Sequence, residues 1–88
     1  MKRCYIVSYD IRAGGEYDPL YEALKAYGTW AKITESTWAI VTDETAVQVR
    51  DNLRNFINEE DRLFVVKSGV EAAWHKVRCS NAWLKKNL

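Results

Sequence analysis

The 88-residue chain is poor in the residues on which several protein classes depend. It has two cysteines, Cys4 and Cys79, which are too few for a disulfide framework, so we expect two reduced thiols. The single histidine, His75, has no metal-ligand spacing to either cysteine, so the sequence does not predict a zinc site. No segment is long and apolar enough for a membrane span or a signal peptide. We therefore expect a cytoplasmic protein with no membrane partner.

Motifs with a known chemical mechanism are also missing. The chain has no Cys-x-x-Cys pair of a metallochaperone, no RNP-type strand of an RNA-recognition motif, and no phosphate-binding or dinucleotide fingerprint. Its 13 basic and 12 acidic residues exclude a generally basic surface for nucleic acid but leave room for a local patch. With 48% hydrophobic residues, residues 1–88 are expected to form one globular domain.

The pattern along the chain predicts alternating strands and helices. A β-branched and aromatic run at 3–10 predicts a strand, and a glycine-rich turn with Gly14 and Gly15 follows it. Asp18 as N-cap and Pro19 as the first helical residue predict a helix over 19–27, with Gly28 as its stop. The other predicted elements are a hairpin of strands 29–32 and 35–42 that turns at 33–34, a helix that opens at 42–44 and carries apolar residues from 46 to 57, strands at 63–68 and 70–74, and a last helix capped by Ser80.

This order of elements predicts an α+β fold of the ferredoxin-like, βαββαβ type, with a four-stranded antiparallel sheet and a C-terminal strand/helix tail at 69–88. Both helices would cover one face of the sheet and leave the other open. An open antiparallel face normally alternates polar and apolar residues, but both sides of the predicted strands are largely apolar. A second copy of the chain, the tail, or the bases of a nucleic acid should therefore cover this face.

A symmetric dimer is the most common of these arrangements in proteins generally, so we expect a homodimer with the tail at its interface. Its predicted interface residues are aromatic: Tyr5, Tyr9, Trp38, Phe64 and Trp74.

Charge is unevenly distributed between the body and the tail. Residues 1–66 hold 8 basic and 11 acidic residues, whereas 67–88 hold five basic residues and one acid. Basic residues among aromatic ones suit phosphate neutralisation and base stacking. For Lys85 and Lys86 we favour the simpler reading, in which they match the dipole of a helix end. The candidate nucleic-acid-binding residues are Arg12, Ser36, Lys76 and Arg78.

Asp10 is the most interesting acid because it stands where the first predicted strand turns. The simpler reading is a turn aspartate that bonds its own backbone. The functional reading needs a two-fold axis near the strand end, which would bring two copies of Asp10 together. Two close carboxylates either raise a pKa or recruit a hard cation such as Mg²⁺.

Three segments resemble the Cas-two family of small CRISPR-associated adaptation proteins and their SinR-like relatives. They are Tyr5-Ile-Val-Ser-Tyr-Asp10-Ile11, Tyr27-Gly28 after the first helix, and Glu35-Ser36-Thr37-Trp38. The resemblance covers residues 3–68. It implies a ferredoxin-like homodimer formed through the open sheet face, with paired Asp10 residues holding Mg²⁺ or Mn²⁺.

The resemblance further implies a nucleic-acid-related function. In a metal-dependent endonuclease acting on RNA or DNA, Asp10 would be the catalytic residue, and Arg12 or Ser36 would position phosphate. The dimer could equally be an inactive relative. Acidic residues outnumber basic ones by 10 to 4 in residues 13–61, which disfavours a DNA scaffold and favours the SinR-like branch.

Two alternatives stay open at this point. The first is a non-enzymatic protein-interaction module, of toxin–antitoxin or regulatory type, that uses the sheet face and the tail to bind another protein. The second is a monomer whose tail folds over its own sheet.

Overall fold

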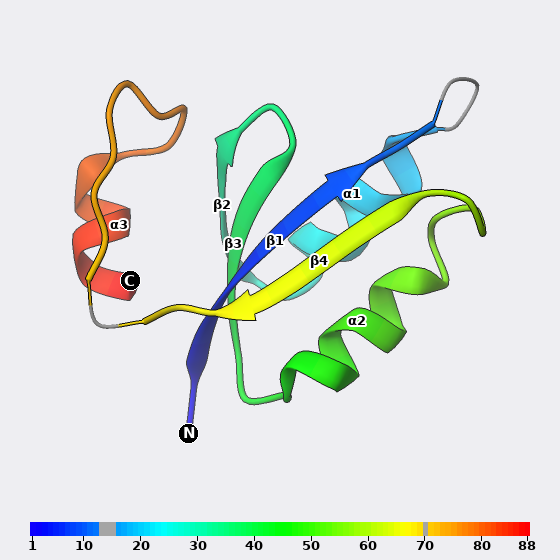
Figure 1. Ribbon diagram of the computed structural model, residues 1–88. Coiled ribbons are helices and arrows are strands. Elements are labelled where there is room, and N and C mark those ends of the chain that lie inside the picture. The colour runs from blue at the N-terminus through cyan, green and yellow to red at the C-terminus, as the bar shows by residue number, and fades with distance from the viewer. Residues whose placement is uncertain (13–15, 70) are drawn as a thin grey trace.

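The computed structural model describes residues 1–12, 16–69 and 71–88 (Figure 1). Gly14 and Gly15, for which a turn was predicted, lie outside these ranges. Within them the chain forms four strands and three helices. Their bounds are β1 Arg3–Asp10, α1 Asp18–Lys25, β2 Thr29–Thr34, β3 Thr37–Thr42, α2 Ala46–Arg54, β4 Arg62–Lys67 and α3 Asn81–Asn87.

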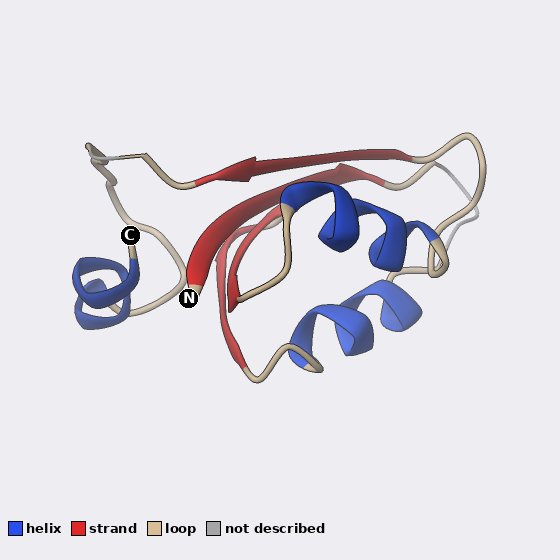
Figure 2. Ribbon diagram, turned by 90° about the horizontal axis from the view of Figure 1, so that it is seen from below, coloured by secondary structure: helices blue, strands red, loops and turns tan. Residues whose placement is uncertain are grey.

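The described strands form one antiparallel sheet in the order β2-β3-β1-β4. Central strand β1 pairs with β3 on one side and with β4 on the other, so β2 and β4 are the edges. Helices α1 and α2 lie together on one face of this sheet, whereas α3 lies apart from them (Figure 2). The predicted α+β class and the four-stranded antiparallel sheet are confirmed.

Alternation along the central strands builds the core. Tyr5, Val7 and Tyr9 of β1 point toward α1 and α2 and are buried, as is Trp38 of β3, which is paired with Val7. The helices contribute a matching apolar stripe, and burial of each large apolar side chain stabilises the fold by about 1.5–3 kcal/mol. The fully buried helical residues are Leu20, Leu24, Val49 and Leu53.

The helix ends differ in detail from the predictions. Asp18 is the first residue of α1 rather than its cap; Tyr17 takes the cap position without a side-chain hydrogen bond. Helix α2 begins later than predicted, because Thr45 and Gln48 form a reciprocal capping box that satisfies both backbone N–H groups. It also ends at Arg54, so the apolar residues predicted up to residue 57 run beyond the helix.

The hairpin turns two residues later than predicted. Strand β2 continues through Ile33 to Thr34, and the turn consists of Glu35 and Ser36. The Tyr9 N–H donates to the Ser36 carbonyl at 3.1 Å, which ties this turn to β1. The position of the turn is set by the register between the strands, and local sequence does not encode that register.

The C-terminal segment, defined here as residues 71–88, contains α3 but no strand. The predicted strand at 70–74 is wrong for residues 71–74, and residue 70 lies outside the described ranges. The predicted cap is confirmed, because the Ser80 hydroxyl accepts a hydrogen bond from the Trp83 N–H at 3.1 Å. Within the described residues, no helix is long and apolar enough to cross a membrane.

This segment lies on the side of the strands away from α1 and α2 (Figure 2). Three small residues that face this side, Cys4, Ala31 and Ala39, are buried, and so is Leu84 of α3. A seven-residue helix cannot bury its own leucine, so the C-terminal segment and the β2-β3 half of the sheet cover each other. The tail thus folds back on its own sheet, but it covers only part of the face.

Candidate functional site

Asp10 lies at the end of β1, directly opposite Arg62 of β4. The Arg62 Nη1 donates to Asp10 Oδ2 at 3.1 Å, and both side chains are largely exposed. The adjacent loop is held by Asp61, whose carboxylate accepts hydrogen bonds from the backbone N–H groups of Arg12 and Asn58. The carboxylate at this strand end is therefore compensated within its own chain.

One copy of the chain offers few ligands for a divalent cation at this strand end. A hard cation needs several oxygen ligands, and one carboxylate that is already paired with a guanidinium is a poor start. Among residues 1–12, 16–69 and 71–88, no three His, Cys, Asp or Glu side chains gather as a group that could hold a metal ion. Metal binding by the Asp10 residues of two copies stays a prediction; in each copy the cation would compete with Arg62 for the carboxylate.

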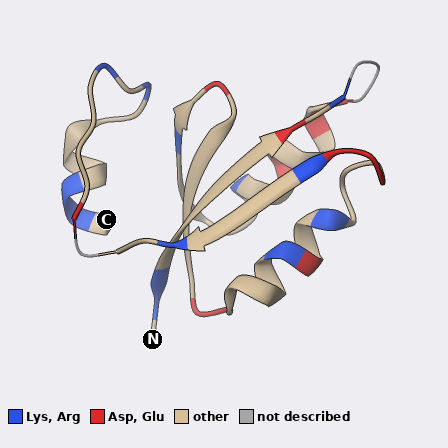
Figure 3. Cartoon of the chain, viewed as in Figure 1, with Lys and Arg blue, Asp and Glu red and all other residues tan. Residues whose placement is uncertain are grey.

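The four predicted nucleic-acid residues gather only in part. Ser36 in the β2-β3 turn and Arg78 of the C-terminal segment approach each other through Glu35, whose carboxylate accepts from Arg78 Nη1 at 2.9 Å. Arg12 belongs to the loop after β1, and Lys76 lies at a bend with a left-handed φ of 53°. Figure 3 shows acidic and basic residues mixed along this end of the sheet rather than a basic surface.

The predicted interface residues separate into two groups. Tyr5, Tyr9 and Trp38 face the helices and are at most 4% exposed within one chain. They are removed from the predicted interface, because the pleat turns them into the core. Phe64 is 62% exposed on the opposite side, and Trp74 is half-buried with its Nε1 donating to Asn81 Oδ1 at 3.0 Å.

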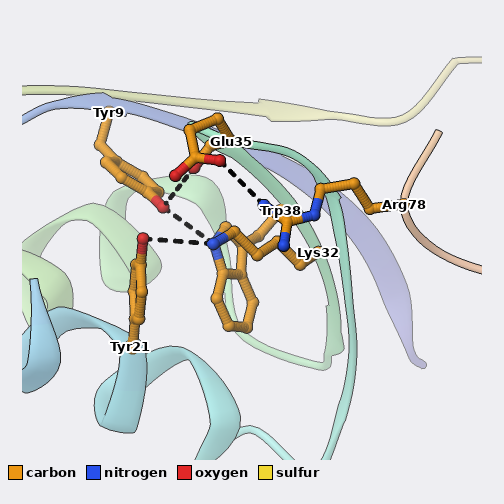
Figure 4. A network of polar contacts seen from close by, with 6 residues as sticks. All are labelled: Tyr9, Tyr21, Lys32, Glu35, Trp38 and Arg78. Carbon is orange, nitrogen blue, oxygen red and sulfur yellow. Dashed lines mark hydrogen bonds and ion pairs between the residues drawn. The ribbon is translucent and has the colours of Figure 1, made fainter.

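A polar network that the sequence did not predict joins the core to the β2-β3 turn (Figure 4). The Tyr9 hydroxyl donates to the Glu35 carbonyl at 3.1 Å and accepts from Trp38 Nε1 at 3.0 Å. Lys32 Nζ donates to the Tyr21 hydroxyl at 3.3 Å and lies 4.6 Å from the centre of that ring.

This network has a structural role rather than a catalytic one. Burial, together with the hydrogen bond to Tyr21, raises the pKa of Tyr9 well above the usual tyrosine value. A catalytic phenolate needs the opposite shift. Tyr9 therefore stays neutral at physiological pH, and the same Glu35 that it holds from inside anchors Arg78 from outside. The β2-β3 turn is fixed from two directions.

An exposed apolar surface surrounds β4, and we call it the β4 surface. It consists of Phe64 (62% exposed), Val66 (41%) and Val47 of α2 (55%). A groove of about 300 Å³ runs between α2 and β4 and is bounded by Val47, Arg50 and Phe64 among others. Phe64 was expected at an interface, but Val47 was not, because it lies off the apolar stripe of its helix.

Cys4 and Cys79 are both free thiols, the first buried and the second half-buried. Cys4 is buried under the C-terminal segment, and burial raises its thiol pKa, so it is a poor nucleophile. Cys79 is half-buried beside Trp30 and Trp83, in a shallow groove between β2 and the C-terminal segment.

Comparison with protein-family models and with curated proteins finds no match to this chain.

Proposed function

We propose that the protein is a homodimeric binding module of ferredoxin-like fold, an inactive relative within the SinR-like branch of Cas-two-like proteins. The fold proposal is supported by the βαββαβ order of the first six elements and by a strand order in which β3 separates β1 from β2. It is also supported by the position of α1 and α2 on one face (Figure 2). These three observations fit a split βαβ arrangement.

One observation carries the functional proposal. Phe64 and Val66 project from the side of the sheet away from α1 and α2, where the C-terminal segment covers Cys4, Ala31 and Ala39 but leaves these two exposed. Neighbouring exposed apolar residues on an ordered strand mark an interaction site. A second copy is the favoured occupant because closed two-fold dimers are the commonest assemblies.

Binding rather than catalysis is supported by the charges. Arg62, which lies opposite Asp10, and Arg78, one of the predicted nucleic-acid-binding residues, each pair with an acid of their own chain. A phosphate would have to displace Asp10 or Glu35 to reach them. Metal-dependent cleavage of RNA or DNA stays a prediction, as does a cytoplasmic location.

Sedimentation of three proteins tests the proposal. The wild type is expected to be a dimer at micromolar concentration, and Phe64→Ser a folded monomer. Phe56→Ser is the matched control, because Phe56 is also exposed (39%) but lies after α2, away from the β4 surface. A monomeric wild type, or equal loss of the dimer in both variants, overturns the proposal.

A cleavage assay with Mg²⁺ or Mn²⁺ tests the nuclease alternative. Wild type and Asp10→Asn are expected to leave RNA and duplex DNA intact to the same extent. Cleavage by the wild type that Asp10→Asn abolishes would establish the catalytic reading instead. A gel shift at low salt adds a second readout, since phosphate-dominated binding weakens steeply as salt rises.

A further inference from the structure

The outer edge of β4 carries backbone groups whose direction follows from two hydrogen bonds. The Ser68 N–H donates to the Cys4 carbonyl at 2.8 Å, whereas the Tyr9 N–H points to the other side, at Ser36. Since antiparallel bonding alternates along a strand, the even-numbered residues of β4 bond to β1. Leu63, Val65 and Lys67 therefore direct their N–H and C=O groups outward, away from the sheet.

Exposed apolar side chains flank this edge on both faces. Phe64 and Val66 stand on the face away from the helices, while Val47 of α2 stands on the helix side. Packing of two sheets face to face would cover only the first pair. A partner strand added to the edge, with its own helix beside α2, shelters both sides and bonds the free backbone groups.

The charges along the strand favour one direction. The acidic run Glu59-Glu60-Asp61 precedes β4, and Lys67 ends it. Arg62, the first residue of β4, pairs with Asp10 of its own chain and leaves this end acidic. Two copies in antiparallel orientation bring each acidic end beside the basic end of the other copy. Parallel copies would set like charges side by side.

We infer, on the basis of the proposed homodimer, that β4 pairs antiparallel with β4 of a second copy, with Val65 on the two-fold axis. In this register Leu63 bonds to the partner's Lys67, and Val65 to the partner's Val65. It is the register in which all three outward-facing residues of β4 find partners within β4. Phe64 then lies opposite the partner's Val66, so the two exposed apolar residues meet as a cross-strand pair.

The consequence is a single sheet that runs through both copies. The two α2 helices lie side by side on one of its faces, and the groove beside Val47 closes at the interface. Such a dimer uses one identical strand twice, so it is closed and does not continue into a fibre. The β2 edge stays at the outside, next to the C-terminal segment.

Amide hydrogen exchange on the wild-type dimer tests the inference without any mutation. The N–H groups of Val65 and Lys67 are expected to exchange slowly in the dimer and to become fast on dilution to monomer. Those of Phe64 and Val66 are the internal controls, because β1 protects them in both states. Fast exchange of Val65 and Lys67 in a confirmed dimer overturns edge pairing.

Disulfide trapping in a Cys79→Ser background gives a second readout. Val65→Cys keeps Phe64 and Val66 and is expected to form a covalent dimer on mild oxidation, whereas Leu63→Cys, which lies opposite Lys67 of the second copy, stays largely monomeric after denaturation. A face-packed dimer predicts no cross-link in either variant, because Leu63 and Val65 face the helices. Sedimentation separates the two failures: no dimer at all refutes the proposed function, whereas a dimer without the Val65→Cys cross-link refutes only the edge register.

Discussion

The two edge strands of the sheet meet solvent in different ways. At β2, the Ile33 carbonyl accepts a hydrogen bond from the Arg78 N–H at 2.9 Å, and the C-terminal segment buries Ala31. At β4, no other described strand pairs with the outer side, and Leu63-Phe64-Val65-Val66 runs without a charge. Proteins usually protect edges with charge, bulges or covering segments. This chain protects one edge and leaves the other ready to bind.

The difference also appears in the strands themselves. Strand β2 contains Lys32 and an irregular register between Lys32 and Thr34, both of which discourage further pairing. Strand β4 has regular register along its whole length. The C-terminal segment, together with the composition and register of the strands, therefore decides which edge stays available.

The largest expected effect comes from releasing the covered edge. Leu84→Ala removes the buried anchor of the C-terminal segment and should lower the free energy of unfolding by about 2–5 kcal/mol. Urea unfolding measures the loss. Lys85→Ala, on an exposed neighbour, is the control and should change stability little. Equal stability of the two variants would mean that α3 is not docked.

Tyr9→Phe tests whether the β2-β3 turn is held from inside. The variant loses the hydroxyl that bonds the Glu35 carbonyl and leaves the buried Trp38 N–H without its acceptor. We expect a loss of about 1–3 kcal/mol, measured by thermal or urea unfolding. Tyr17→Phe, on an exposed tyrosine of the same aromatic cluster, is the comparison. Unchanged stability in Tyr9→Phe would contradict the network.

Arg78→Ala tests the outer anchor of the same turn. The Arg78–Glu35 pair is exposed, so its loss should cost at most about 1 kcal/mol. The backbone bond to Ile33 does not need the side chain and should persist. Slow hydrogen exchange of the backbone amide at position 78 of the variant would confirm this. Fast exchange would show that the ion pair holds the C-terminal segment in place.

Ionisation of Tyr9 should leave the free energy of unfolding unchanged near neutral pH and lower it at high pH. Burial raises the pKa of Tyr9 above its unfolded value, so the folded state holds this proton more tightly. The resulting stability is complete below pH 10.0, the ordinary tyrosine pKa, and is lost as pH rises further. Urea unfolding from pH 8 to pH 11 should show a steeper decline for wild type than for Tyr9→Phe. Parallel curves would contradict the assignment.

Local patterns predicted much of the fold. The β-branched run of β1, the apolar spacing of α1 and the Ser80 cap of α3 are all encoded within a few residues. The α2 cap was also readable, since Thr45-x-x-Gln48 is a capping-box pattern, but acids at 43–44 drew the predicted start too early. Boundaries were less accurate because register, not propensity, fixes where β2 ends.

The candidate site was less predictable. Alternation shows that Tyr5 and Tyr9 share a face, yet it cannot say which face the helices cover. The Asp10–Arg62 pair joins residues 52 positions apart, and only the β1-β4 register brings them together. Phe64 was predicted at an interface and is exposed in one copy of the chain, whereas Val47 joined the same surface only once α2 was placed beside β4.

The sequence by itself determined the number and order of the main elements, because hydrophobic period and capping residues act over a few positions. It also determined that the sheet is apolar on both faces. Tertiary structure alone decided how that surplus is shared: the C-terminal segment covers the half of the second face near β2, and the half near β4 stays exposed. The physical reason is that burial depends on which distant segments meet, and Leu84, Ala39 and Phe64 carry no local signal of their neighbours.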